Sequence, residues 1–158
     1  MITIVSHDAG GAEIISDWVL KQKKNFNYIL KGPAIKIFKR KIKNIKISKS
    51  LKFIKKSKEI ITGSSWGDLI EIKAIKLAKK YKVKTITFLD HWENYKIRFL
   101  YKKKLILPDV IWVTDKFAYK IAIKEFPKTR IVKKQNDYLI RIKEKILKKR
   151  IKIVTFFM

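Results

Sequence analysis

Short runs of β-branched residues alternate with amphipathic segments along most of this chain. We interpret residues 2–5, 27–30, 44–47, 59–62, 83–89, 109–114 and 130–133 as strands, and residues 11–23, 51–56, 69–81, 91–102, 116–126 and 135–149, with a short stretch after Pro33, as helices. Strands separated by helices are typical of a parallel sheet with crossover connections. The sequence therefore predicts an α/β fold of three layers with a mainly parallel sheet. Only residues 32–58 support two interpretations, alternating strands or short helices.

The length of the chain sets the number of domains that we expect. Its 158 residues, 47 % of them hydrophobic, suffice for one core. We assign residues 1–150 to this domain. The last stretch, RIKIVTFFM, has the composition of a strand. It is either a final strand of the same sheet or, as we prefer, the first strand of a second domain that begins at residues 151–158.

The cysteine count and the amino terminus indicate the compartment. The chain contains no Cys, so it has no disulfide framework and no thiol nucleophile. The stretch MITIVSHDAGG has no basic segment ahead of an apolar one, and the longest uncharged stretch, Ile60 to Gly67, is far shorter than the roughly 20 residues that span a bilayer. We expect a cytoplasmic protein. Attachment to the inner face of the membrane stays open.

A net charge of +27 is the most unusual feature of the composition. Clustered basic residues attract phosphate backbones. However, only five of the 40 basic residues are Arg, and Lys is the weaker choice for bidentate recognition of bases and phosphates. We favour a compositional origin for the charge. Binding to an anionic membrane surface and to nucleic acid are the lesser alternatives, and we expect no specific nucleic-acid partner.

Polar loops follow four of the predicted strands. In an open parallel sheet, ligands bind beyond the carboxyl ends of the strands. The loops are SHDAGGAE, GSSWGD, DHWENY and the pair Thr114-Asp115, so both histidines of the chain fall at this edge. We expect one cleft there, lined by His7, Gly10, Gly11, Ser64, Ser65, His91, Asn94 and Asp115.

Gly10 and Gly11 permit a tight turn that brings the N–H groups of a helix start close to an anion. The alternative is a structural turn with Asp8 as the helix cap. The loop lacks the three-glycine dinucleotide fingerprint and the Lys and Ser/Thr of a phosphate-binding P-loop. We therefore expect no nucleotide cofactor.

The loop TGSSWGD also has two interpretations. Ser65 and Asp68 have the spacing of a capping box, although Asp replaces the usual Glu or Gln. In the functional interpretation, Ser64 and Ser65 hold a hydroxyl or phosphate of a ligand at the helix start. Trp66 then stacks on a sugar ring, or else it packs on the sheet.

A helix that begins near His91 would carry His91, Asn94 and Arg98 on one face, and aromatic residues on the neighbouring face. The aromatic face would fix the helix on the sheet and leave the polar face to line the cleft. With Asp90 or Asp8 as a partner, His91 would serve as an acid or base.

Metal binding and nucleophilic catalysis are less favoured. His7, Asp8, Asp90 and His91 would supply two imidazoles and two carboxylates if they converged. Adjacent residues after a strand point in different directions, so this spacing is not diagnostic and we assign no metal site. A strand–Gly-x-Ser-x-Gly–helix elbow for a Ser nucleophile is missing from the sequence.

Four stretches in this order and spacing carry a family resemblance: SHDAGGAEIIS, ITGSSWGDLIE, TFLDHWENYKIRF and LPDVIWVTDKFAYKIA. Together they resemble the amino-terminal half of GT-B-type glycosyltransferase-like proteins associated with polysaccharide biosynthesis, which are similar to lipid-linked N-acetylglucosaminyltransferases and nucleotide-sugar 2-epimerases. The resemblance implies a Rossmann-like acceptor domain that faces a second, nucleotide-sugar-binding domain. By this resemblance, the loop from His7 to Gly11 lies where acceptor loops lie, and His91 and Asn94 belong to a polar loop that lines the cleft. From the strand-end positions together with the resemblance, we expect catalytic roles for two histidines, His91 and His7. We expect ligand contacts from nine further residues: Asp8, Gly10, Gly11, Ser64, Ser65, Asp90, Asn94, Arg98 and Asp115.

The resemblance covers roughly Met1 to Tyr138, and of the second domain only the opening strand has a counterpart, in KKRIKIVTFFM. The expected function is the acceptor-binding half of a glycosyltransferase-like protein, which becomes an enzyme only when a second domain or partner chain completes it. Its partners would be a sugar or lipid-linked acceptor and a nucleotide-sugar. The alternative is a basic Rossmann-like module that binds an anionic membrane surface or nucleic acid without catalysis.

Overall fold

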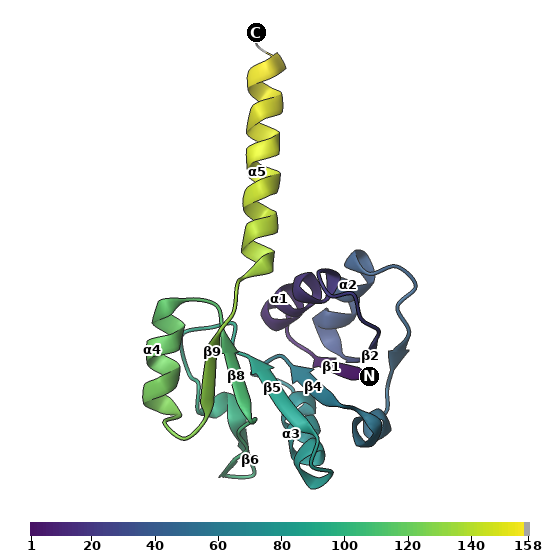
Figure 1. Cartoon of the computed structure of the whole chain (residues 1–158), viewed down its shortest axis with the longest axis vertical. Helices are drawn as coiled ribbons and strands as arrows, with labels where there is room; N and C mark the ends of the chain where they lie inside the picture. Colours follow the sequence, from purple (N-terminus) through teal and green to yellow (C-terminus); the bar gives the residue numbers. More distant parts are fainter. Residues whose placement is uncertain (157–158) are drawn as a thin grey trace.

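The computed structural model describes the backbone of residues 1–156 and the side chains of residues 1–148. Seven parallel strands form one sheet in the order β3-β2-β1-β4-β5-β8-β9 (Figure 1). Their bounds are β1 Ile2–Ser6, β2 Phe26–Leu30, β3 Ile47–Ser48, β4 Glu59–Thr62, β5 Lys84–Phe88, β8 Val110–Val113 and β9 Arg130–Lys133. The predicted parallel sheet is confirmed.

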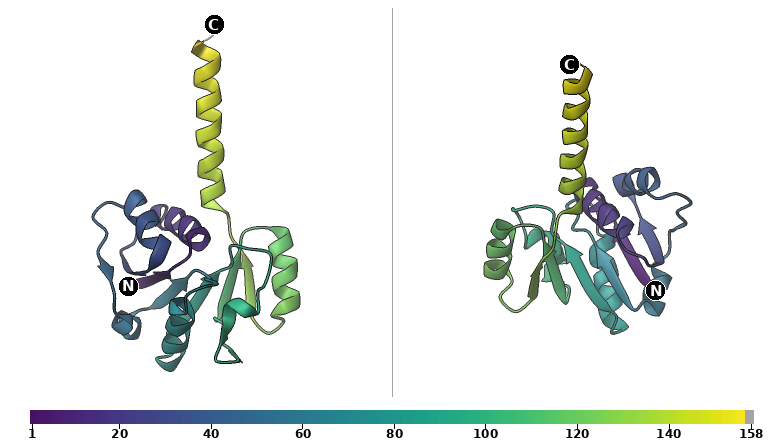
Figure 2. Two further views of the ribbon diagram at one scale, coloured as in Figure 1. Left: turned by 180° about the vertical axis from the view of Figure 1, so that it is seen from behind. Right: turned by 45° about the horizontal axis from the view of Figure 1, so that its top comes forward.

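Helices cover both faces of the sheet (Figures 1 and 2). On one face, α1 (Ala9–Leu20) and α2 (Gly32–Lys41) pack on alternate residues of β1, β4 and β5 around Ile4, Ile15 and Phe38. On the other face lie η1 (Leu51–Lys56), α3 (Ile70–Lys80) and α4 (Lys116–Glu125), and the core there divides into two clusters. This arrangement confirms the three-layer, Rossmann-like fold class.

The strand order reverses direction at β1. The chain runs from β1 outward through β2 to β3, and then returns to place β4 on the other side of β1. In sheets of this kind the connections diverge at such a point and leave a crevice beyond the carboxyl ends of the strands. The loops after β1 and β4 flank this position.

Most predicted elements lie within two residues of the observed ones, and the strands at 59–62 and 130–133 have the predicted bounds. In the ambiguous region, the expected strand at 44–47 is a two-residue strand at Ile47–Ser48, because Asn44 has a φ of 55° and turns the chain. Residues 51–56 form a 3₁₀ helix, η1, on the face that α3 covers.

The predicted helix over residues 91–102 is wrong. A loop follows β5, then a 3₁₀ turn, η2 (Ile97–Phe99), and a small antiparallel hairpin of β6 (Leu100–Tyr101) and β7 (Lys104–Leu105). Asn94 has a φ of 58°, which is incompatible with an α-helix, and Lys102 and Lys103 have the positive φ angles of a type I′ turn. Tyr95 and Phe99 have helical spacing, but they reach the core from this irregular backbone.

Helix α5 (Asp137–Phe156) begins against α1 and then extends away from the domain (Figures 1 and 2). The strand that we expected from Arg150 onward is helical as far as Phe156, whereas residues 157–158 lie outside the described part of the chain. The assignment of residues 151–158 to a second domain stays a prediction. None of the described helices combines the length and the apolar character needed to cross a membrane.

Candidate functional site

A cleft of about 440 Å³ lies at the carboxyl edge of the sheet. We call it the Asp90 cleft. Its walls are largely apolar with several polar groups among them, and they come from the loops after β5, β8 and β9 and from the N-terminal turns of α1, α4 and α5. The residues that line it are Ala9, Gly10, Glu13, Ile14, Leu89, Asp90, His91, Trp92, Thr114, Asp115, Ala118, Asn136, Tyr138 and Leu139. Of the predicted site residues, Gly10, Asp90, His91 and Asp115 meet here.

Asp90 is the buried carboxylate of this cleft. Its Oδ1 accepts a hydrogen bond of 3.0 Å from the Ser64 hydroxyl, and the guanidinium of Arg98 lies 3.5 Å from the same oxygen. Arg98 also donates to the carbonyl oxygen of Ser64 over 2.6 Å. Within the described structure, Oδ2 has no hydrogen-bond donor and faces Gly10. One oxygen of Asp90 is thus held by the protein, and the other is free to accept from a ligand.

Trp92 and His91 form the exposed lip of the cleft. The indole of Trp92 is 59 % exposed, and its Nε1 donates to Oδ2 of Asp115 over 2.9 Å. The other oxygen of Asp115 accepts from the backbone N–H groups of Phe117 and Ala118 and so caps α4. Burial opposes the ionisation of Asp115, but these hydrogen bonds outweigh it and lower the pKa. Asp115 therefore stays charged and fixes the indole beside the exposed His91.

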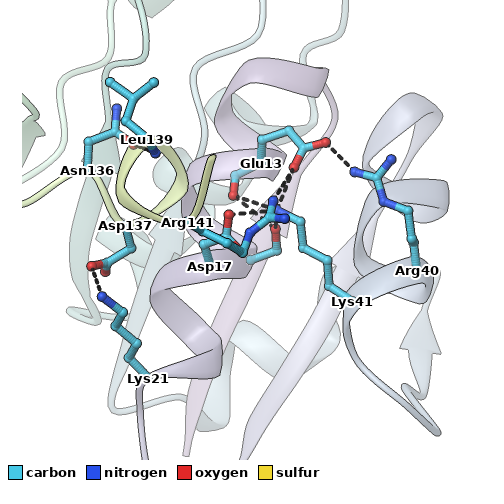
Figure 3. A network of polar contacts seen from close by, with 10 residues as sticks. Glu13, Asp17, Lys21, Arg40, Lys41, Asn136, Asp137, Leu139 and Arg141 are labelled. Carbon is cyan, nitrogen blue, oxygen red and sulfur yellow. Dashed lines mark hydrogen bonds and ion pairs between the residues drawn. The ribbon is translucent and has the colours of Figure 1, made fainter. Parts of the chain in front are cut away.

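The α1 side of the cleft rests on a network of ion pairs (Figure 3). Asp17 of α1 is 3 % exposed and accepts from Lys41 of α2 over 3.0 Å and from Arg141 of α5 over 2.8 Å. Lys41 also pairs with Glu13, which lines the cleft. Burial opposes the ionisation of Glu13, but hydrogen bonds and charges from Lys41 and Arg40 outweigh it and lower the pKa. The network ties three helices together beneath the cleft.

The same network positions the first turn of α5. Lys21, the residue that follows α1, donates to Asp137 over 2.7 Å, and Asp137 is the first residue of α5 (Figure 3). The next residues, Tyr138 and Leu139, line the cleft together with Asn136. The far wall of the cleft is therefore placed by ion pairs between α1 and α5.

The loops after β1 and β4 are bound to each other rather than open to a ligand. Glu71 of α3 is 2 % exposed, and its Oε1 accepts from the backbone N–H of His7 over 2.9 Å. Burial raises the pKa of Glu71 to about 7. Oδ2 of Asp8 accepts from the N–H of Trp66 over 2.9 Å. These contacts fill the position where the strand order reverses.

The remaining predicted residues lie around the cleft without lining it. Gly11 packs against Gly63, where a Cβ on residue 11 would lie 3.2 Å from Cα of residue 63. Ser64 and Ser65 are buried and donate within the protein, and Arg98 is buried beneath Ser64. Asn94 is exposed outside the cleft. His7 pairs with Asp8 and lines a different pocket.

Several residues of the cleft were not predicted: Glu13, Trp92, Thr114, Asn136 and Tyr138. Asn136 follows β9, so the rule that identified Asp115 after β8 also identifies Asn136 when it is applied to the last strand. Thr114 adjoins Asp115 in the sequence. Glu13 lies one turn into α1, and Tyr138 lies at the start of α5. No local pattern in the sequence marks either residue as part of a site.

Among the described side chains, no group of three or more His, Asp or Glu residues is placed to hold a metal ion. His7 and Asp8 pair with each other, and Asp90 pairs with Arg98. Of the carboxylates that line the Asp90 cleft, Glu13 pairs with Lys41 and Asp115 caps α4. The groups that we consider for proton transfer or ligand binding there are Oδ2 of Asp90 and the imidazole of His91.

No protein-family model matches the chain, and comparisons with curated proteins and with solved structures gave no significant match.

Proposed function

We propose that the Asp90 cleft binds a sugar acceptor, and that the chain is the acceptor-binding half of a glycosyltransferase-like protein in surface polysaccharide or glycoconjugate biosynthesis. The observation that carries this proposal is the exposed indole of Trp92 beside the carboxylate of Asp90, the imidazole of His91 and the amide of Asn136. A sugar ring presents apolar C–H groups on its face and hydroxyl groups at its rim. An indole packs on the apolar C–H face of the ring, and the polar groups form hydrogen bonds with the hydroxyl groups at its rim.

The proposed roles follow from position. Oδ2 of Asp90 accepts a hydrogen bond from a hydroxyl of the acceptor, because Oδ1 is already bound to Ser64. His91 is exposed at the lip and takes the proton of the reacting hydroxyl. The oxygen of that hydroxyl attacks the anomeric carbon of a nucleotide-sugar, and the bond from this carbon to the phosphate oxygen breaks. A second domain or partner chain holds the nucleotide-sugar, so the chain alone binds the acceptor without turnover.

Saturation-transfer NMR on the chain tests this proposal. The probes are N-acetylglucosamine, glucose, galactose and glucose 1-phosphate at millimolar concentration. We expect transfer to at least one of them, with the strongest signals from the protons of the ring face that packs on Trp92. Trp92→Ala and His91→Ala should each weaken this binding about tenfold or more, since each removes a direct contact.

Asn94→Gly is the matched control, because Asn94 lies in the same loop but outside the cleft, and Gly accepts its φ of 58°. It should bind the sugar as the unmodified chain does. Saturation transfer to none of the four probes, or equal binding by the Trp92 and Asn94 variants, would contradict the proposal.

A basic binding module is the second candidate, and the net charge of +27 favours it. Trp66, Trp92 and Phe117 are exposed at the carboxyl edge, and the Lys116 ammonium lies over the Phe117 ring. Aromatic and basic side chains together suit an anionic interface. Vesicles that contain phosphatidylserine distinguish the two functions: if they bind the chain at 0.3 M salt and the four sugars do not, the module is favoured.

A further inference from the structure

A second pocket, of about 470 Å³, lies at the carboxyl ends of β2 and β3. We call it the His7 pocket. It is lined by His7, Ile29, Leu30, Lys31, Gly32, Ile35, Lys39, Ile47, Ser48, Lys49 and Ile70. None of these residues lines the Asp90 cleft. The His7 pocket is therefore a separate site from the proposed sugar site.

The floor of the His7 pocket is aliphatic. Ile29, Leu30 and Ile70 are buried beneath it, and Ile35 and Ile47 are half-buried at its sides. Its walls contain no Phe, Tyr or Trp. A nucleotide base or a sugar ring is commonly held by an aromatic face, and this pocket does not offer one. A surface of this kind suits a flexible hydrocarbon chain.

The rim of the pocket is positively charged. Lys31, Lys39 and Lys49 stand around the aliphatic floor, and no Asp or Glu is among the lining residues. Lys31 lies 3.6 Å from Asp68, while among the described side chains no carboxylate pairs with Lys39 or Lys49. The first turn of α2 borders the same space and adds partial positive charge. Two lysine ammonium groups are thus available to a ligand anion.

His7 is held in a fixed orientation at this rim. Its Nδ1 lies 2.6 Å from Oδ1 of Asp8, and its Nε2 approaches Gly32 so closely that a Cβ there would lie 2.6 Å away. Gly32 has a φ of 48°, which favours Gly on its own account. The carboxylate of Asp8 occupies Nδ1, and Nε2 faces Gly32, the first residue of α2. Of the two ring nitrogens, Nε2 is therefore the one on the α2 side of the pocket.

We propose that the His7 pocket binds an anionic amphiphile, a single phosphate or carboxylate headgroup on a hydrocarbon chain. The hydrocarbon chain of this ligand lies on Ile35 and Ile47, and its headgroup pairs with Lys39 and Lys49. This inference goes beyond the sugar site and does not depend on it, since the two sites share no lining residue.

Calorimetric titration with dodecyl phosphate below its micelle-forming concentration tests the proposal. We expect saturable binding that weakens as the alkyl chain is shortened, by about fourfold for each methylene that is fully buried. Laurate should bind more weakly than dodecyl phosphate, because it carries less negative charge. Inorganic phosphate alone should bind too weakly to detect. In the methyl NMR spectrum, the resonances of Ile35 and Ile47 should shift.

Charge-matched variants separate the pocket from the general basicity of the chain. Lys39→Glu with Lys49→Glu should weaken the binding of dodecyl phosphate at least tenfold. Lys36→Glu with Lys52→Glu, two exposed lysines outside the pocket, should change it less than twofold. All four positions are exposed, so both variants should melt within a few degrees of the unmodified chain.

Three results would overturn the proposal. The first is that dodecyltrimethylammonium binds as tightly as dodecyl phosphate, which would mean that the positive rim does not select the headgroup. The second is an equal loss in the two double variants, which would mean that the anion binds to the basic surface at large. The third is a shift of methyl resonances elsewhere while those of Ile35 and Ile47 stay in place.

Discussion

Gly10 and Asp90 lie so close together that a Cβ on residue 10 would overlap Oδ2 of Asp90 and lie 3.2 Å from its Cγ. Asp90 cannot move away freely, because Ser64 and Arg98 hold its other oxygen. The first turn of α1 and the loop after β5 can therefore meet this closely only with Gly at position 10. This contact determines how closely α1 approaches the floor of the Asp90 cleft.

Gly10→Ala should destabilise the domain by about 1–3 kcal/mol, because the added methyl group displaces a buried, hydrogen-bonded carboxylate. Urea unfolding followed by circular dichroism measures the effect. Gly67→Ala is the control, since a Cβ on residue 67 meets nothing within 4 Å. If the two variants unfolded at the same urea concentration, Asp90 would be able to move away from the added methyl group without a loss of stability.

The contacts of Ser65 indicate that Glu71 carries a proton. The Ser65 Oγ lies 2.5 Å from the carbonyl oxygen of Asp68 and within hydrogen-bond distance of Oε2 of Glu71. A hydroxyl has one hydrogen, so it cannot donate to both. If Oε2 is protonated it donates to Ser65, and Ser65 donates to Asp68. This pattern agrees with the raised pKa of about 7 for Glu71.

Stability should consequently fall as the pH rises. The folded domain binds the Glu71 proton more tightly than the unfolded chain, whose pKa is 4.5, so the free energy of unfolding drops between pH 4.5 and about 7 and levels off above. The total change is roughly 3 kcal/mol. Glu71→Gln preserves the hydrogen bonds of the neutral acid and should flatten this part of the profile. Urea unfolding at pH 5, 6, 7 and 8 measures it.

Glu93→Gln is the matched control for this experiment, because Glu93 is exposed. Its profile should keep the slope of the unmodified chain. If Glu71→Gln kept that slope as well, the pH dependence would come from other groups and Glu71 would be ionised in the folded domain.

Arg141→Ala should loosen the first turns of α5, because it removes the hydrogen bond to the buried Asp17. The free energy of local opening should fall by about 1–2 kcal/mol, visible as faster amide hydrogen exchange over the first turns of α5. Lys145→Ala is the control, because Lys145 is exposed on the same helix. It should leave hydrogen exchange at these amides unchanged. Equal exchange in both variants would mean that Tyr138 and Asp137 hold α5 without Arg141.

Asp115→Ala should cost about 1–2 kcal/mol, because Asp115 caps α4 through two backbone hydrogen bonds of 2.8 Å. Asp115→Asn keeps an acceptor oxygen and should recover most of this loss. Thermal unfolding of the two variants measures the difference. An Asn variant as unstable as the Ala variant would show that the charge of Asp115, rather than the cap, stabilises the helix start.

Local patterns were sufficient for six of the seven strands of the sheet, the exception being β3, which was expected at residues 44–47 and lies at Ile47–Ser48. The strands at 59–62 and 130–133 are short β-branched runs bounded by polar residues, and both were predicted with their observed bounds. The segment after β5 was mispredicted because Tyr95 and Phe99 have the spacing of a helical face. Their burial depends instead on Phe126, which comes from a distant part of the chain: Tyr95 stacks on its ring, and Phe99 meets it edge-on.

The candidate site was predictable in part. Gly10, Asp90, His91 and Asp115 follow strands directly, and the position of a strand end is a local property. Glu71 was not predictable, because a Glu in a helix is normally exposed and its partner His7 is 64 residues away in the sequence. Glu13 was missed for a similar reason, since its neutralising partner Lys41 lies on another helix.

The interior place of β1 in the sheet, between β2 and β4, also determines the order in which the domain can assemble during translation. β1 is made before the other strands of this sheet, and β2 and β4, its two neighbours, are both complete once residue 62 has been made. Each later strand of this sheet, β5, β8 and then β9, adds to one growing edge. The nascent chain can thus form its inner three strands first and lengthen the sheet at the pace of synthesis, without rearranging what has already paired.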